Sequence, residues 1–498
     1  MSDKARITVI FGAIAALLGG GLYYFLRIYQ PTQEQQAAQT EVLAWEARWA
    51  EARACLLGPK PVSSRPREAL AVRELSPDPW NRGTCSKLIG KLSRGVADDT
   101  GILKVEHAWM TVDRAAAKVA TAFASHVDPF GDVPEHRGDS PLPAALEELE
   151  GAQADLRKAA GMDPPDSAAG PTLPAAQLIP LKDGGQQVSN LEAWLLPSSG
   201  GVIGFGSTHD REVEMVLVAG AAPKLLPAPS GGVRAVTDAT WGAAGLQDEV
   251  VVGPIDDKGA FGTMTNIPAG ELARVLFAVG TIADGLVAYG AGGKLGLIRA
   301  TAGSIKGDAP FQVSRVMYAL TPAGRALLAW NTVDGAMRGF FPKGGAETRP
   351  MELGSGFAAS ACLTATHGWV GEEPQFMSFD DTSATPHVLP QHELLGCSDD
   401  AALLHKIGST SYAVCTDACR VAELRNTKSS VVATLANAKV VAIRARGEVI
   451  GLWRENAEPL FFTTPISMSP RTAISDGKVV DVIGETSEGV VVARLPLR

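Results

Sequence analysis

The densest group of side chains with metal-ligand chemistry in this sequence is His387, His392, Glu393 and His405. A metal site on a strand needs side chains that point to the same face. His387 and His392 are separated by an odd number of residue steps, which places them on opposite faces of a strand. We therefore interpret these residues as surface or loop histidines, and the sequence predicts no metal site.

Paired aspartates recur near the ends of apolar runs, at 256–257, 380–381 and 399–400. Two carboxylates can act as acid and base or bind calcium. Aspartate also favours turns, because its side chain bonds to nearby backbone groups. The sequence contains no G-x-S-x-G elbow, P-loop or H-E-x-x-H motif. Turns are therefore the expected role of these aspartates, and the sequence identifies neither catalytic residues nor a cofactor.

Two pairs of cysteines are close in sequence. Cys415 and Cys419 flank a turn-like tripeptide between two strand-like runs, which fits a disulfide across a hairpin. A metal interpretation is weak, because no second ligand pair follows at a suitable spacing. Cys55 ends one expected helix and Cys85 begins the next, on either side of a long connection that contains proline. Outside the cytoplasm, that placement predicts a disulfide that closes the connection.

The composition is that of a globular chain with many turns. Of 498 residues, 46% are hydrophobic and 20% are charged, which excludes wholesale disorder. The 53 glycines and 32 prolines suit tight turns. The net charge is −9, so nothing favours a nucleic acid as partner. The length predicts two or three domains.

An unbroken run of uncharged, mostly apolar residues covers positions 7–26. As a helix it would span about 30 Å, the thickness of one hydrocarbon core. The run predicts a transmembrane anchor that follows a short tail at 1–6. A cleaved signal peptide is the alternative, but its apolar core is shorter and ends at a small-x-small site.

Charges around this run predict its orientation. Lys4 and Arg6 precede it, whereas acidic residues dominate after Arg27. The positive-inside rule then predicts a single-pass membrane protein with a cytoplasmic N-terminus and the bulk of the chain periplasmic or extracellular. Small residues at four-residue spacing would allow two anchors to pair as a dimer, through Gly12, Ala16 and Gly20.

From residue 31 to 162 the apolar residues follow a helical spacing. Three such seams, within 42–56, 105–123 and 142–156, predict a bundle of three or four helices. Two roles stay open for it: a stalk that lifts the next domain off the bilayer, or a coiled coil that binds a partner. A linker rich in proline and alanine is predicted at 163–173.

From about residue 174 to 498, short apolar strands separated by turn residues replace the helical spacing. Similar segments end in an aromatic residue at Tyr289, Trp330 and Trp453. The first two are 41 residues apart, and the next interval is 123 residues, three times as long. Weaker copies bring the number of these markers to eight.

A period near 41 residues, built of short antiparallel strands, resembles the β-propeller superfold. The resemblance covers roughly 320 residues and is to an architecture rather than to a named family. It implies a β-propeller for this part of the chain. With the segments predicted before it, the expected fold is mainly β, with an N-terminal transmembrane helix, a small α-helical segment and a C-terminal β-propeller. We count eight blades, with seven as the alternative, and a β-sandwich pair or a solenoid would also produce short strands. The segment around 177–181 is expected to complete the last blade and close the ring.

The remaining two cysteines, Cys362 and Cys397, fall at equivalent places in successive repeats. A disulfide between them would bridge adjacent blades. The four C-terminal cysteines allow three pairings, and sequence alone does not choose between them. With the local pairs favoured, we predict three disulfides and no free thiol.

Together these features predict a membrane-anchored extracytoplasmic β-propeller that acts as a binding or scaffolding module for an unidentified protein partner. Enzymatic activity is the less expected outcome. Two alternatives stay open: a propeller hydrolase or lyase acting on polysaccharide, with carboxylates in the central channel, and a subunit of an envelope assembly. Propellers suit binding because their loops vary freely on a rigid scaffold.

Overall fold

The structure is a computed structural model in which two compact units divide the chain, Met1–Leu173 and Pro174–Arg498. It describes residues 3–497 except 26, 28–29, 60, 76–79, 94–101, 127–139, 164–171, 195–200, 228–239, 271, 303, 345–348, 357–358, 425–430 and 436. Most of the predicted linker at 163–173 therefore lies outside the described residues.

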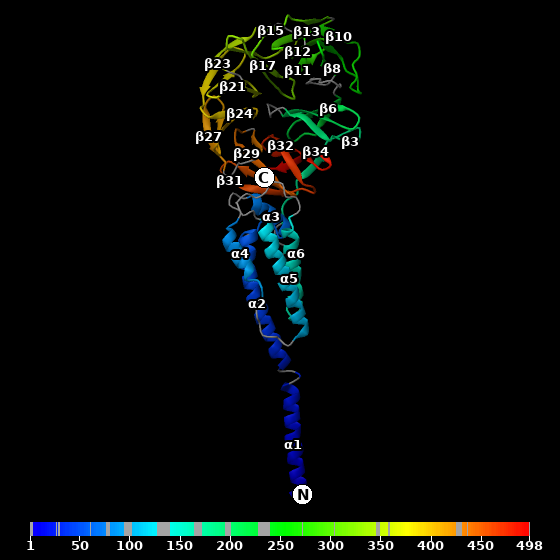
Figure 1. Ribbon diagram of the computed structural model, residues 1–498, viewed down its shortest axis with the longest axis vertical. Helices are drawn as coiled ribbons and strands as arrows, with labels where there is room; N and C mark the ends of the chain where they lie inside the picture. The colour runs from blue at the N-terminus through cyan, green and yellow to red at the C-terminus, as the bar shows by residue number, and fades with distance from the viewer. Residues whose placement is uncertain are drawn as a thin grey trace. The chain divides into compact units, whose positions relative to one another are not determined.

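The first unit is helical (Figure 1). Its helices are α1 (Asp3–Tyr24), α2 (Gln30–Leu57), α3 (Pro66–Leu75), α4 (Arg82–Gly90), α5 (Leu103–His126) and α6 (Leu142–Ala159). The predicted seams are the buried faces of α2, α5 and α6, and they meet in one apolar core. Helix α3 was not expected; it occupies the proline-containing connection between α2 and α4.

Indole groups and a disulfide hold the helical core together. Trp45 of α2 donates from its indole Nε1 to the backbone oxygen of Leu92 at 2.8 Å. Trp80 donates in the same way to Leu56 at 3.0 Å. Both indoles are buried, so each N–H finds the partner that a buried donor needs. Helix α4 begins one turn earlier than its sequence suggested, because Asn81 caps it and accepts from the backbone N–H of Thr84.

The predicted transmembrane anchor at 7–26 is wrong. In the part of the chain that the structure describes, no helix combines the length and the apolarity needed to cross a membrane. The prediction counted uncharged positions, many of which are glycine or alanine, and these residues bring little apolar surface. Three further predictions depended on this anchor and are withdrawn with it. They are the single-pass topology with a cytoplasmic tail at 1–6, the contact with a membrane through 7–26, and the location deduced from the anchor.

The second unit is a β-propeller (Figure 1), and the described strands form eight sheets, which we number as blades in chain order, with one additional hairpin. Blades one to four are β4 (Asn190–Trp194), β5 (Val202–Ser207), β6 (Glu212–Leu217), β7 (Lys224–Pro227); β8 (Trp241–Leu246), β9 (Glu249–Pro254), β10 (Thr265–Pro268); β11 (Arg274–Thr281), β12 (Asp284–Ala291), β13 (Lys294–Thr301), β14 (Ser304–Gly307), β15 (Phe311–Gln312); and β16 (Arg315–Leu320), β17 (Ala326–Asn331), β18 (Ala336–Phe340), β19 (Met351–Ser355).

Blades five to eight are β20 (Ser360–Leu363), β21 (Gly368–Glu372), β22 (Gln375–Phe379), β23 (Ala384–Val388); β24 (His392–Cys397), β25 (Ala402–Lys406), β26 (Ser411–Cys415), β27 (Cys419–Glu423); β28 (Val431–Thr434), β29 (Val440–Arg446), β30 (Val449–Arg454), β31 (Ala457–Thr463); and β32 (Met468–Ser475), β33 (Val479–Thr486), β34 (Gly489–Pro496) with β1 (Gln177–Pro180). The additional hairpin is β2 (Lys182–Asp183) with β3 (Gln186–Gln187).

Blades stack face to face, so their middle strands are buried on both sides. Every residue of β17 is buried, for example, whereas the outer strand β23 is mostly exposed. Shared apolar clusters join blades two and three, three and four, four and five, five and six, seven and eight, and eight and one. The first strands of neighbouring blades lie close to each other. Strand β16 lies beside β20, and β20 lies beside β24. The first strand is therefore the inner one in these blades.

Ring closure occurs where the sequence predicted it. Strand β1 pairs antiparallel with β34, from Gln177 opposite Arg494 to Pro180 opposite Val491. The last blade thus combines the two ends of the unit, and this leaves no open edge on β34. The predicted period is confirmed only as an average. The first strand of blade one begins at Asn190 and that of blade eight at Met468, so successive blades begin about 40 residues apart on average.

Candidate functional site

Three neighbouring hairpins that follow first strands share the same turn chemistry. Thr364 accepts at Oγ1 from the backbone N–H of His367 at 2.9 Å, and Ser398 accepts at Oγ from that of Ala401 at 3.3 Å. Thr321 accepts from Arg325 in the same way at 3.1 Å. Serine and threonine favour such turns because the hydroxyl replaces a backbone partner. We call the face formed by hairpins 321–325, 364–367 and 398–401 the loop face.

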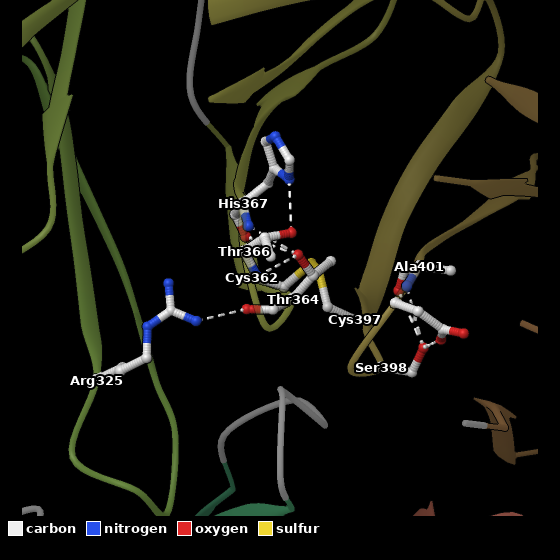
Figure 2. The surroundings of a disulfide bond; sticks show 9 residues. Arg325, Cys362, Thr364, Thr366, His367, Cys397, Ser398 and Ala401 are labelled. Carbon is white, nitrogen blue, oxygen red and sulfur yellow. Dashed lines mark hydrogen bonds between the residues drawn. A yellow bond between two sulfur atoms is a disulfide. The ribbon is translucent and has the colours of Figure 1, made fainter. Parts of the chain in front are cut away.

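The hairpins of the loop face are tied to one another across blade boundaries (Figure 2). Arg325 of blade four donates from Nη1 to the backbone oxygen of Thr364 at 3.0 Å, and also to that of Ala365. The N–H of Ala365 donates to the backbone oxygen of Asp399 at 2.6 Å. Three successive blades are therefore linked, blades four and five by the Arg325 side chain on two backbone oxygens and blades five and six by a main-chain hydrogen bond.

A disulfide reinforces this link. Cys362 lies in the inner strand β20, and Cys397 lies in the inner strand β24. Their Cα atoms are 5.5 Å apart. Both residues are buried in the cluster between blades five and six. The covalent bond crosses the blade boundary beside the Ala365–Asp399 hydrogen bond, and so holds the hairpins 364–367 and 398–401 in a fixed relation.

A small pocket of about 110 Å³ lies between the ends of the first strands of blades six to eight and residues Gly201, Val218 and Ala219 of blade one. Asp399 and Asp476 line it, together with Ser398, Thr434 and Ile474. Sites for drug-sized ligands usually measure roughly 300 Å³ or more. The pocket therefore has room for a single side chain or a few atoms, and not for a sugar chain.

The electrostatics near the loop face favour ionised carboxylates. Hydrogen bonds from the backbone N–H and hydroxyl of Thr382, then from the N–H of Ser383, lower the pKa of Asp380 to about 2. The pKa of Asp476 is lowered by the backbone N–H groups of Val479 and Lys478, although its partial burial opposes that shift. Lys343 pairs with Asp381 at 2.7 Å. Such carboxylates are anchored acceptors rather than proton donors.

The structure joins the cysteines in the pairs that the sequence favoured. Cys55–Cys85 connects α2 to α4 with Cα atoms 5.6 Å apart. Cys415–Cys419 spans a directly opposed pair of β26 and β27, with Cα atoms 4.0 Å apart. Whether these bonds form in the protein stays a prediction, for which a thiol-labelling experiment is the test.

The histidine group divides into separate contacts. His405 and Glu393 are opposed on β25 and β24, and Nδ1 lies 2.9 Å from Oε1. His392 turns away and bonds to the backbone oxygen of Pro390. His387 lies on β23 of the preceding blade, stacked on Trp369. Among the described residues, no three of the histidines, cysteines and acidic residues are arranged to hold a metal ion.

A buried polar cluster in the helical unit was missed by the sequence. His126 Nε2 lies 2.7 Å from Glu74 Oε1, at ion-pair distance but without hydrogen-bond alignment. His126 Nδ1 lies 2.5 Å from Ser140 Oγ. The side chains of His126 and Glu74 are 4% and 6% exposed, so the contact links α3 to α5 inside the core. No local motif signals it, because the residues come from three separate segments.

A groove of about 580 Å³ lies between α5 and α6. Thr121, Pro141 and other residues line it, and an ion pair of 2.7 Å between Lys118 and Glu148 connects the two helices there. The groove is the larger of these two hollows.

These features define the second unit as an eight-bladed β-propeller whose loop face is cross-linked between blades four, five and six. No protein-family model and no curated protein matches the chain. Among solved structures it is similar to the β-propeller domain of Cps50 (Swd1) from Myceliophteria thermophila, at 10% identity and a TM-score of 0.34, over 65% of this chain and 100% of that one.

Two other propellers show the same degree of likeness. Hsv2p of Kluyveromyces lactis is 9% identical with a TM-score of 0.35, over 55% of this chain and 96% of that one. The Dos1 propeller is 12% identical with a TM-score of 0.28, over 65% of this chain and 82% of that one. The likeness is one of fold.

Proposed function

We propose that this chain is a binding or scaffolding module that recognises a protein partner through the loop face. The observation that supports this most is the cross-blade link of hairpins 321–325, 364–367 and 398–401 through the Arg325 side chain, a main-chain hydrogen bond and the Cys362–Cys397 disulfide. A surface that is already ordered loses less conformational entropy on binding, so more of the contact energy becomes affinity.

The chemistry of the pocket argues against the alternative of a polysaccharide hydrolase or lyase. Such an enzyme needs one carboxyl group held protonated near neutral pH beside a second one that is ionised. Of the two aspartates that line the pocket, Asp476 has a lowered pKa, the opposite of the shift that a proton-donating carboxyl group needs. The pocket volume of about 110 Å³ also leaves no room for a sugar ring and its neighbours.

The exposed side chains of the loop face suggest the chemistry of the partner. Asp399 and Asp400 stand exposed at the tip of the hairpin 398–401, and Asp417 is exposed in the hairpin between β26 and β27 of the same blade. We propose that a basic segment of the partner contacts these carboxylates. Rim charges of this kind mainly set the association rate and its salt dependence.

The test is a charge reversal at matched positions. A partner is first captured by crosslinking the full chain in cells of its source, and its affinity for the purified full chain is then measured. Asp400→Lys on the loop face is compared with Glu488→Lys, the same change in an exposed hairpin at the opposite ends of the strands. We expect Asp400→Lys to weaken binding about tenfold, as the loss of a favourable charge contact and the addition of a repulsive one would.

Equal affinity of the two variants, or a loss confined to Glu488→Lys, would refute the loop face as the recognition surface. The predicted dimer through Gly12, Ala16 and Gly20 is a separate expectation, and it stays a prediction. A role as an envelope subunit rested on the membrane anchor and is not part of this proposal.

A further inference from the structure

The hairpin disulfide Cys415–Cys419 lies against a histidine from the neighbouring blade. His387 Nδ1 is 3.9 Å from the Sγ atom of Cys419. The two residues are separated by 32 positions in the chain, and they meet because β23 of blade five and β27 of blade six are the outer strands of adjacent blades. A sulfur atom and an imidazole nitrogen are thereby placed within reach of a proton transfer.

The histidine is fixed by two further contacts. Its Nε2 atom lies 2.8 Å from Ser378 Oγ on the neighbouring strand β22. Its ring stacks on Trp369, with ring centroids 4.6 Å apart and planes inclined by 29°. Ser378 and Trp369 therefore hold Nδ1 toward the sulfur. Burial lowers the pKa of His387, so the ring is neutral at pH 7 and has a nitrogen that can accept a proton.

The two sulfurs differ in access. Cys415 is fully buried, whereas Cys419 is partly exposed beside the exposed tripeptide 416–418. The same difference separates the exchanging and the resolving cysteine in a thiol–disulfide exchange site: an incoming thiolate reaches one sulfur, and the other stays inside. The second disulfide of the cluster, Cys362–Cys397, is buried at both ends, which shields it from attack.

The outer strands next to the site offer a place for a polypeptide. Strands β23 and β27 are edge strands of their sheets. Val388, beside His387, is 72% exposed, and Val421, two residues after Cys419, is 71% exposed. An extended segment can pair with an edge strand through main-chain hydrogen bonds while its apolar side chains cover such valines.

We propose that Cys415–Cys419 is a thiol–disulfide exchange site for a polypeptide dithiol, with Cys419 as the exchanging cysteine and His387 as its proton acceptor. A thiolate of the polypeptide attacks Sγ of Cys419, the Cys415–Cys419 bond breaks, and the electron pair passes to the Cys415 sulfur, which takes a proton from solvent. The second thiolate of the polypeptide then attacks its own sulfur in the mixed disulfide. Cys419 leaves as a thiolate and takes a proton from solvent, which had received the protons of the two peptide thiols, and the polypeptide is oxidised to a disulfide, one per chain.

In the reverse direction, His387 takes the proton of Cys419 and generates the thiolate that attacks. A thiolate, not a thiol, is the nucleophile in such exchanges. The role of His387 therefore predicts a faster reaction of the reduced Cys419 than that of a thiol without this neighbour.

The first experiment measures the folded full chain in a series of glutathione buffers. Differential alkylation followed by peptide mass spectrometry gives the reduced fraction of each disulfide. We expect Cys415–Cys419 to be reduced at a higher rate than Cys362–Cys397 in each buffer, because Cys419 is partly exposed whereas Cys362 and Cys397 are both buried. Equal rates for these two disulfides would overturn the proposal.

The second experiment measures the alkylation rate of the reduced Cys419 by iodoacetamide at pH 7. We expect the rate to fall at least about threefold in His387→Gln, because the proton acceptor is lost. His405→Gln is the matched control, a histidine of blade six that bonds to Glu393 instead, and its rate should equal that of the unchanged chain. An unchanged rate in His387→Gln would remove the assigned role.

The third experiment uses a synthetic peptide with a single cysteine. In Cys415→Ala, Cys419 is oxidised to a mixed disulfide with glutathione and then exposed to the reduced peptide. We expect a complex of the peptide with Cys419 to accumulate, since neither Cys415 nor a second peptide thiol is present to resolve it. In Cys419→Ala, treated in the same way, no complex should form because Cys415 is buried. Complexes of equal yield in both variants would refute the assignment of Cys419 as the exchanging cysteine.

Discussion

Two disulfides, Cys362–Cys397 across the boundary of blades five and six and Cys415–Cys419 within blade six, allow a quantitative prediction. They lie in the same cluster and close loops of very different length. Cys362 and Cys397 are separated by 35 residues, and Cys415 and Cys419 by 4. In the chain-entropy model, the longer loop stabilises the folded state by about 3.8 kcal/mol and the shorter one by about 1.9 kcal/mol. Replacing both cysteines of the first pair by alanine should therefore cost about 2 kcal/mol more.

The assay must report on these blades alone, since a chain of two units does not unfold in one step. Hydrogen exchange with mass spectrometry gives the opening free energy of peptides from β21 and β25, in the full chain and in each double-alanine variant. The two variants control for each other, because both remove two sulfurs from one cluster. An equal loss in both, or a larger loss for Cys415 and Cys419, would refute the reasoning.

Three further perturbations have expected outcomes. Deleting residues 489–498 removes β34, to which both β33 and β1 pair, so limited proteolysis should show unfolding of the whole β unit rather than fraying of its end. Glu74→Gln removes the ion-pair partner of the buried His126, and urea unfolding of the helical unit should show a loss of about 1–3 kcal/mol. Asp380 has a pKa lowered to about 2, so it contributes stability above its unfolded pKa that is lost as the pH falls from about 4 to 2; Asp380→Asn should abolish this part of the acid profile, and an unchanged profile would contradict it.

The propeller was predictable from the sequence because a strand, a turn and a second strand repeat in chain order, and such local features are visible in one dimension. The sequence did not show on which strand of each blade the aromatic residue would lie. Tyr289 and Trp330 stand on second strands, β12 and β17, whereas Trp453 stands on a third strand, β30. Spacing counts residues and not strands, and loops of unequal length shift the aromatic residue from one strand to the next.

Contacts between distant segments explain the other differences. His387 meets Cys419 and His126 meets Glu74 only because separate elements pack together, so no spacing reveals them. Helix α3 was hidden by Pro66, which reads as a breaker but occupies the first position of the helix, where its missing N–H costs nothing. The anchor failed for a different reason: the absence of charge in 7–26 was taken as apolarity.

All four cysteines of the propeller lie in blades five and six, whose strands are four to six residues long. A short strand makes fewer ladder hydrogen bonds and buries less apolar surface against the next blade than a strand of eight residues such as β11 or β32. Blades one, two and four have strands of four to six residues and no cysteine, so strand length alone does not decide where the cysteines lie. A covalent bond adds stabilisation at one boundary between short blades, as disulfides do in domains with small cores. The buried disulfide Cys362–Cys397 therefore supports the boundary between blades five and six, and the more exposed Cys419 of the same cluster can exchange without opening that boundary.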